Sequence, residues 1–215
     1  MSSIRVVPTP HGDARLVTDR SKHPITTLLL NHGAGGGVEA ADLEALASTL
    51  PRQGISVIGL EQPWKVAGKR LAPRPAVLDE CLVAAADKTR VRTPLVVGGR
   101  SAGARAAARC AGSLGASGCL ALAFPLHPPG RPERSRVGEL DDVRLPTLII
   151  QGERDPFGRP EEFPTRYDLA VVPEANHSFV VPRRAAISSE EALAIIVEAT
   201  LEWIVREVVG NRIDK

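Results

Sequence analysis

Short apolar runs alternate with longer, mixed stretches along most of this chain. The apolar runs cover residues 25–31, 55–60, 95–98, 119–124, 147–150 and 169–172. They are apolar throughout rather than at every second position, which is typical of strands covered on both faces of a parallel sheet. We therefore predict that each run forms a buried strand.

The stretches between these runs have the spacing of helices. We expect helices over residues 39–50, 76–89 and 101–111, and a long final helix after the capping box Ser188-Ser189-Glu190-Glu191. Residues 206–215 are expected to form a tail, and residues 4–18 to add one or two antiparallel edge strands. The alternation predicts a single α/β domain over residues 1–215, with a mostly parallel twisted sheet and helices on both faces.

Composition narrows the class of protein. The chain has 215 residues, 43% hydrophobic and 24% charged, with a formal net charge of +2, which is ordinary for a globular domain and gives no reason to expect nucleic-acid binding. We find no signal-peptide pattern and no apolar run of membrane-spanning length, so we expect a cytoplasmic protein without membrane contact. Cys81, Cys110 and Cys119 are expected to be free thiols. Nothing in the sequence predicts the oligomeric state.

Four polar or glycine-rich segments follow predicted strands. They are NHGAGGG at 31–37, GGRSAG at 98–103, QGERDPFG at 151–158 and PEANHSF at 173–179. In open parallel sheets the functional residues lie beyond the carboxyl ends of the strands. We therefore expect these segments to meet at one edge of the sheet.

Residues 99–103, GRSAG, match the G-x-S-x-G pattern of a nucleophile elbow. Small flanking residues let the strand and the helix approach closely, and the helix N-terminus directs N–H groups at the site. The pattern by itself is also typical of a plain tight turn. The apolar run before it and the helix expected after it favour Ser101 as a nucleophile.

A serine nucleophile needs a base, and the base needs a carboxylate to orient it. Among five histidines, His177 is our first candidate because it follows the last predicted strand. His127 is a reserve candidate, better suited to lining the pocket. Asp155 follows the strand predicted at residues 147–150, although an aspartate before proline is also common as a turn residue. The order Ser101, Asp155, His177 along the chain is the one used by hydrolases with this elbow.

The oxyanion of an acyl-transfer intermediate also needs N–H donors. The main-chain N–H of Ala102 is one candidate, and the turn after residue 31 offers a second, with Ala34 first and Gly35 next. This chemistry requires no cofactor and no metal ion. It predicts hydrolysis of a small-molecule ester, or of a related thioester or amide.

From about residue 25 to the final helix the chain resembles the α/β-hydrolase superfamily. The segments NHGAGGG, GGRSAG, PLHPPG, GERDPFG and ANHSF look like a small, lidless, dienelactone-hydrolase-like branch, which includes a non-catalytic subunit of a histone-acetyltransferase complex. The resemblance implies that Ser101, Asp155 and His177 are nucleophile, acid and base. Dienelactone hydrolases proper have cysteine in place of Ser101, so their lactone substrate is not implied. The span 124–145 is too short for a cap domain and predicts an open pocket for short-acyl or acidic esters.

Two other functions fit parts of the sequence. Residues 35–40 match G-x-G-x-x-A, and Glu61 ends the next strand, as in a dinucleotide-binding oxidoreductase. A hydrolase fold could also serve as a binding or interaction protein with an idle triad.

Side chains near the four loops could contact a substrate. Arg100, with Arg131, Arg134, Arg154 and Arg159, could bind a carboxylate or phosphate, or form a solvated rim. Trp64 could form an apolar wall of the pocket or pack in the core.

Overall fold

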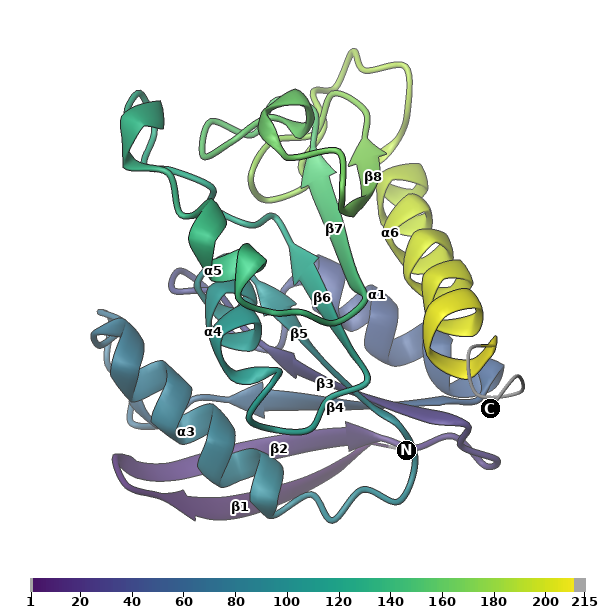
Figure 1. Cartoon of the computed structure of the whole chain (residues 1–215). Helices are drawn as coiled ribbons and strands as arrows, with labels where there is room; N and C mark the ends of the chain where they lie inside the picture. Colours follow the sequence, from purple (N-terminus) through teal and green to yellow (C-terminus); the bar gives the residue numbers. More distant parts are fainter. Residues whose placement is uncertain (1, 211–215) are drawn as a thin grey trace.

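The computed structural model describes residues 2–210 and contains one eight-stranded sheet (Figure 1). Its strands are β1 (Ser3–Thr9), β2 (Gly12–Asp19), β3 (Thr26–Asn31), β4 (Ile55–Glu61), β5 (Leu95–Arg100), β6 (Gly118–Leu122), β7 (Thr147–Gly152) and β8 (Asp168–Val172). The order across the sheet is β1-β2-β4-β3-β5-β6-β7-β8. Strands β3 to β8 run parallel, and the β1–β2 and β2–β4 pairs are antiparallel. The predicted fold class and the antiparallel edge are confirmed.

Helices cover both faces of this sheet (Figure 1). They are α1 (Ala41–Thr49), α2 (Pro63–Val66), α3 (Pro75–Asp87), α4 (Ala102–Cys110), α5 (Val137–Asp141) and α6 (Ser189–Trp203). Helices α1 and α6 pack together on one face, and α3, α4 and α5 lie on the other. Each face has its own hydrophobic core, and the middle strands contribute side chains to both. This explains why their sequences are apolar without alternation.

Several element boundaries differ from the predictions. Helix α1 begins at Ala41, since Ala40 still has an extended backbone. Strand β6 ends at Leu122 because the next residue, Ala123, turns the chain with a φ of +44°. The capping box at Ser188 is confirmed, with its hydroxyl accepting from the Glu191 N–H. The final helix continues as a π-helical segment over Ile204–Val209, so the expectation of a tail from residue 206 was wrong. Residues 211–215 lie outside the described residues.

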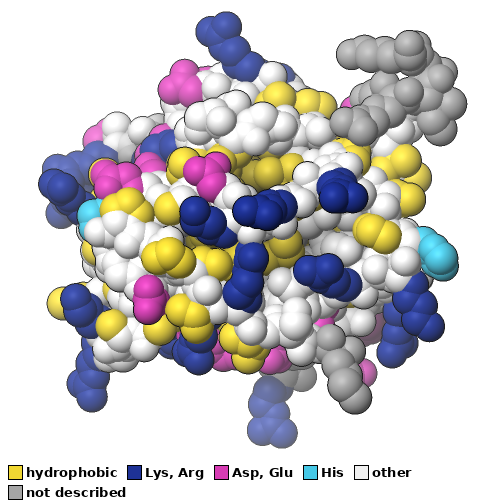
Figure 2. Space-filling model, turned by 90° about the horizontal axis from the view of Figure 1, so that it is seen from below, with side chains coloured by type: hydrophobic (Ala, Val, Ile, Leu, Met, Phe, Trp, Pro, Cys, Tyr) yellow, Lys and Arg dark blue, Asp and Glu magenta, His cyan; other side chains and the backbone are white. Residues whose placement is uncertain are grey.

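A basic groove lies where the central strands begin, at the end of the sheet opposite the four loops. It is lined by β1, by the segment before β5 and by the cations Arg5, Arg20, Arg90 and Arg92. Figure 2 views the molecule from this side and shows Lys and Arg side chains around a hydrophobic hollow. Within residues 2–210, no helix is long and apolar enough to cross a membrane.

Candidate active site

Ser101 lies in a sharp turn between β5 and α4. Its φ of +54° and ψ of −114° place it in a region that non-glycine residues rarely occupy. The turn is held by the Ser101 N–H, which donates to the Leu122 carbonyl at 2.9 Å, and by the Arg105 N–H, which donates to the Ser101 carbonyl at 3.1 Å. The serine hydroxyl is thereby held at the carboxyl end of the sheet, as the elbow pattern predicts.

The two glycines of the pattern permit a close approach of backbones. A Cβ added to Gly103 would lie 2.2 Å from the Asn31 carbonyl oxygen, and one added to Gly99 would lie 2.5 Å from the same atom. Neither distance is possible for a real side chain, and both obstacles are main-chain atoms. The start of α4 therefore packs directly on the end of β3, and only glycine fits at these positions.

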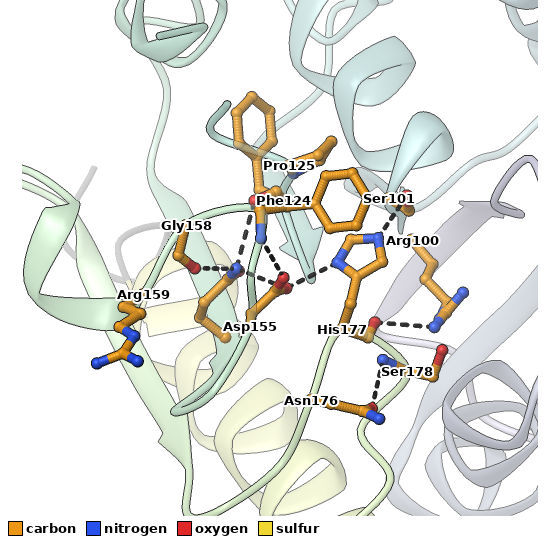
Figure 3. Close-up of polar contacts among 12 residues, drawn as sticks. Arg100, Ser101, Phe124, Pro125, Asp155, Gly158, Arg159, Asn176, His177 and Ser178 are labelled. Carbon is orange, nitrogen blue, oxygen red and sulfur yellow. Dashed lines mark hydrogen bonds and ion pairs between the residues drawn. The ribbon is translucent and has the colours of Figure 1, made fainter. Parts of the chain in front are cut away.

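Ser101, His177 and Asp155 form one hydrogen-bonded chain (Figure 3). The Ser101 Oγ lies 2.9 Å from His177 Nε2, and His177 Nδ1 lies 2.7 Å from Asp155 Oδ2. The Asp155 side chain is fully buried, whereas the His177 side chain is 19% exposed. The structure therefore brings together the three residues selected from the sequence, with the carboxylate shielded and the imidazole edge accessible.

Asp155 is oriented by further hydrogen bonds. Its Oδ1 accepts from the Phe157 N–H at 2.8 Å, and its Oδ2 accepts from the Gln151 side-chain amide at 2.9 Å. The same Gln151 nitrogen donates to the Gly158 carbonyl at 2.8 Å. Gln151 is fully buried at the end of β7. Sequence reasoning missed this residue, although a polar side chain closing an otherwise apolar strand beside the acid loop is a usable signal.

Two further contacts hold His177 in place, one to its ring and one to its main-chain carbonyl. The Phe157 ring packs against the imidazole, with centroids 4.3 Å apart. The Arg100 guanidinium donates to the His177 carbonyl at 2.9 Å (Figure 3). Arg100 Nε also lies 3.0 Å from a carboxylate oxygen of Asp42 on α1, which is 3% exposed. Burial raises the pKa of Asp42, and the nearby Arg100 charge opposes this rise.

These contacts give Arg100 a structural position. Its side chain is only 12% exposed and already contacts the Asp42 carboxylate and the His177 carbonyl. The prediction that Arg100 binds substrate stays untested, and the contacts favour a positioning role for it. The Asp42 partner was missed because it lies almost sixty residues away in sequence, without a local signal.

The glycine-rich turn after β3 lies directly beside Ser101. A Cβ placed on Gly33 would be 3.4 Å from the Ser101 Cβ. Within the described chain, the main-chain N–H groups of Ala34, Gly35 and Ala102 have no hydrogen-bond acceptor. They are therefore free to donate to an incoming oxygen, as the oxyanion prediction requires.

His32 braces this turn from below. Its Nε2 accepts from the Gln62 N–H at 3.1 Å, so the ring proton is on Nδ1, which lies 2.8 Å from the Gly33 carbonyl. Burial lowers the pKa of His32, and its hydrogen bond to the Gly33 carbonyl partly offsets the effect. The neutral ring thus links Gln62, which follows β4, to the glycine-rich turn after β3. This turn, residues 32–37, is called the oxyanion loop below, after its predicted role.

Comparisons with known proteins now place the chain. A model described as an alpha/beta hydrolase domain matches residues 24–205. The chain belongs to the α/β-hydrolase family. Its fold is similar to that of a serine hydrolase without a lid from Xanthomonas campestris, with 20% identity, a TM-score of 0.75, and coverage of 95% of this chain and 94% of that one. It is also similar to dienelactone hydrolase from Anabaena variabilis, with 19% identity, a TM-score of 0.75, and coverage of 96% and 98%.

A third similar structure is Est1E from Butyrivibrio proteoclasticus, solved with ferulic acid bound. It is 14% identical, with a TM-score of 0.68, and the match covers 94% of this chain and 99% of that one. At these identities the likeness concerns the fold. Residues 2–210 of this α/β-hydrolase include no cap domain: the span between β6 and β7 holds only a short 3-10 turn (Pro132–Arg134) and α5.

His127 does not approach the serine. Its Nε2 lies 2.9 Å from Glu162, its Nδ1 lies 2.9 Å from the Pro128 carbonyl, and its N–H donates to the Phe157 carbonyl at 2.9 Å. The hydrogen bond to Pro128 raises the pKa of His127, with Glu162 adding to the effect. These contacts favour a role in tying two loops together, and its predicted place in the substrate pocket stays untested.

The residues chosen for a dinucleotide site are arranged differently in this α/β-hydrolase. Glu61 faces Arg15, with Nε 2.7 Å from its carboxylate, and its side chain is 11% exposed. The glycine-rich turn instead adjoins Ser101. Family membership therefore removes the support for an oxidoreductase.

Proposed function

We propose that this protein is a serine hydrolase that cleaves small carboxylic esters through Ser101, His177 and Asp155. The observation that carries the proposal is the hydrogen-bonded chain from the Ser101 hydroxyl to the buried Asp155 carboxylate, with distances of 2.9 and 2.7 Å. A nucleophile, a base and an orienting carboxylate within hydrogen-bond reach are the geometry that acyl transfer requires.

The reaction proceeds in two halves. His177 Nε2 takes the hydroxyl proton as Ser101 Oγ attacks the ester carbonyl carbon, and the N–H groups of Ala102 and Ala34 stabilise the resulting oxyanion. When the intermediate collapses, the proton on Nε2 passes to the leaving alcohol and an acyl-serine remains. A water molecule, deprotonated by the same imidazole, then attacks the acyl carbon. The bond between that carbon and Ser101 Oγ breaks, the proton on Nε2 returns to Oγ, and the acid is released. Asp155 holds the proton on Nδ1 and stabilises the imidazolium.

Short substrates suit this site because no cap domain shelters a long acyl chain. Est1E, which has a similar fold, was solved with ferulic acid, a carboxylic acid, bound, and this is in keeping with carboxylic-ester chemistry. We expect faster turnover of acetyl than of octanoyl esters of 4-nitrophenol. A clear preference for the octanoyl ester would contradict an open, short-acyl site.

The decisive experiment is covalent labelling. Wild-type protein and Ser101→Ala are treated with a fluorophosphonate probe and examined by intact mass. A single adduct on the wild type that is absent from the variant supports an activated serine at this position. No adduct on a correctly folded wild type would overturn the proposal and favour a hydrolase fold used only for binding.

The cysteines bear on where the protein works. Cys81, Cys110 and Cys119 are free and buried in the structure. We infer that the hydrolase functions in a reducing compartment, with the cytoplasm as the expected location.

A further inference from the structure

A small cavity adjoins the glycine-rich turn after β3. It has a volume of about 330 Å³ and is lined by residues 34–36, by Trp64 on α2 and by the segment that follows α2. Three of the lining side chains are cations, Lys65, Lys69 and Arg70, and none is a carboxylate.

The cavity and the proposed catalytic site share the glycine-rich turn after β3. Ala34 and Gly35, which line it, follow Gly33, the residue whose backbone lies against Ser101. Trp64, which forms its apolar wall, packs against the His32 ring at a centroid distance of 5.5 Å. One turn therefore borders both Ser101 and this space.

The charge of the cavity is not neutralised by the protein. The side chains of Lys69 and Arg70 are exposed and have no hydrogen-bond or ion-pair partner within residues 2–210, and of the three cations only Lys65 approaches an acid, Glu39, at 3.5 Å. Arg154, another cation near the site, is by contrast paired with Glu174 at 3.0 Å.

The polar atoms of the walls are also unused. The main-chain N–H groups of Ala34 and Gly35 have no acceptor in the described chain, and successive free N–H groups of a turn favour an anion. The indole Nε1 of Trp64, a residue that is 7% exposed, is buried without a hydrogen-bond partner.

We propose that this cavity is a subsite for an anionic group of the substrate, a carboxylate or a phosphate, held by Lys69 and Arg70 with Trp64 as its wall. This inference rests on the proposed hydrolase function and specifies its substrate class as acidic esters. It places anion recognition after α2 rather than on Arg100 or the arginines of the later loops.

Matched ester pairs test the proposal. Mono-4-nitrophenyl adipate is compared with its methyl ester for an anion on the acyl side, and 4-acetoxybenzoate with its methyl ester for one on the alcohol side, each after subtraction of the spontaneous rate. We expect the wild type to favour the anionic member of at least one pair by about tenfold in kcat/KM, because two solvent-exposed ion pairs together provide an effect of this order. Raising the ionic strength should reduce the preference.

The variants assign the effect to the cavity. In Lys69→Gln/Arg70→Gln the ratio of anionic to neutral kcat/KM should fall to about one. The control, Arg20→Gln/Arg92→Gln, also removes two positive charges, but from the basic groove at the other end of the sheet (Figure 2), and should keep the wild-type ratio. The absence of a preference in both pairs, or a preference that survives in Lys69→Gln/Arg70→Gln, would overturn the subsite.

A binding readout separates this proposal from the proposed hydrolysis. If neutral esters are cleaved without any preference for anions, the hydrolase stands and the subsite fails. If no ester is cleaved, wild-type tryptophan emission is titrated with adipate and with inorganic phosphate, Trp203 being buried in the other core. A saturable change that disappears in Trp64→Phe and in Lys69→Gln/Arg70→Gln supports the subsite without catalysis and shows which anion it prefers; no change overturns it.

Discussion

The substitution Asp155→Asn tests the proposed triad most sharply, because the surroundings of this side chain dictate what the amide must do. In the wild type the Asp155 carboxylate accepts from the Phe157 main-chain N–H at 2.8 Å and from the Gln151 side-chain amide at 2.9 Å. The asparagine NH₂ can replace either oxygen, so it faces either the Phe157 N–H or the Gln151 amide nitrogen. Both create a contact between two donors. The second is favoured because a side chain can shift more easily than the main chain.

In that second orientation the asparagine NH₂ donates to His177 Nδ1. The ring proton then moves to Nε2, the atom that faces the Ser101 hydroxyl at 2.9 Å in the wild type. An imidazole in this tautomer cannot accept the serine proton. Loss of the correct tautomer lowers kcat by about 10⁴-fold in serine hydrolases, which corresponds to about 5.4 kcal/mol of transition-state stabilisation.

The fold should survive the substitution. One buried donor without an acceptor costs about 1–3 kcal/mol, and at about 2–4 °C per kcal/mol for a chain of this size the Tm falls by roughly 2–12 °C. The assay is kcat/KM on 4-nitrophenyl acetate, with thermal unfolding measured in parallel. Asp142→Asn is the control, since that side chain is exposed and precedes β7. Activity of Asp155→Asn within tenfold of the wild type would refute the assignment of the acid.

Three further predictions concern the surroundings of the site. Arg100→Leu leaves the buried Asp42 carboxylate unpaired and should lower the free energy of unfolding by about 3–5 kcal/mol. Adding Asp42→Leu should restore most of this stability but not kcat/KM. A return of kcat/KM together with stability would contradict a positioning role for Arg100. Gly103→Ala should destabilise the fold by about 1–3 kcal/mol or more, because its Cβ would lie 2.2 Å from a main-chain oxygen, whereas Gly112→Ala, with nothing within 4 Å, should melt like the wild type. The lowered pKa of His32 contributes stability that is complete above pH 6.5 and is lost as the pH falls through the folded-state pKa; the Tm difference between wild type and His32→Asn should therefore shrink between pH 7.5 and pH 5, and a constant difference would show that His32 is not linked to folding.

Most of the sheet could be predicted because buried parallel strands leave an unmistakable apolar run. The ends of the elements could not, since they depend on single backbone conformations. Strand β6 stops because Ala123 adopts a positive φ. An alanine in a sequence gives no indication of this backbone conformation. The π-helical end of the final helix places Ile204 and Val208 in the core, and this burial extends the helix beyond the expected boundary.

The candidate triad could be selected because each member follows its own strand and the chain order limits the choices. Its supporting residues are harder to find. Gln151 lies only four residues from Asp155 and is marked by its place at the end of an apolar strand. Asp42 acts on the site through a contact with Arg100 across the fold, and nothing local in the sequence indicates that contact. Trp64 illustrates the same limit: it is both a packing residue, at 7% exposure, and a wall of the cavity beside the oxyanion loop.

For the proposed serine hydrolase, an open site changes how esters can be discriminated. Without a cap, only a small part of a substrate is enclosed, and each additional methylene in an apolar pocket distinguishes substrates by only about 1–3 kcal/mol. Fixed charges act on a ligand without enclosing it, and the proposed subsite offers two such cations, Lys69 and Arg70, to an anionic group of the substrate. Because Lys69 and Arg70 have no acidic partner within residues 2–210, an anionic substrate need not displace one in order to bind. Selection by charge at the rim is therefore the form of specificity that this lidless fold can provide, and it should be sensitive to salt in a way that selection by shape is not.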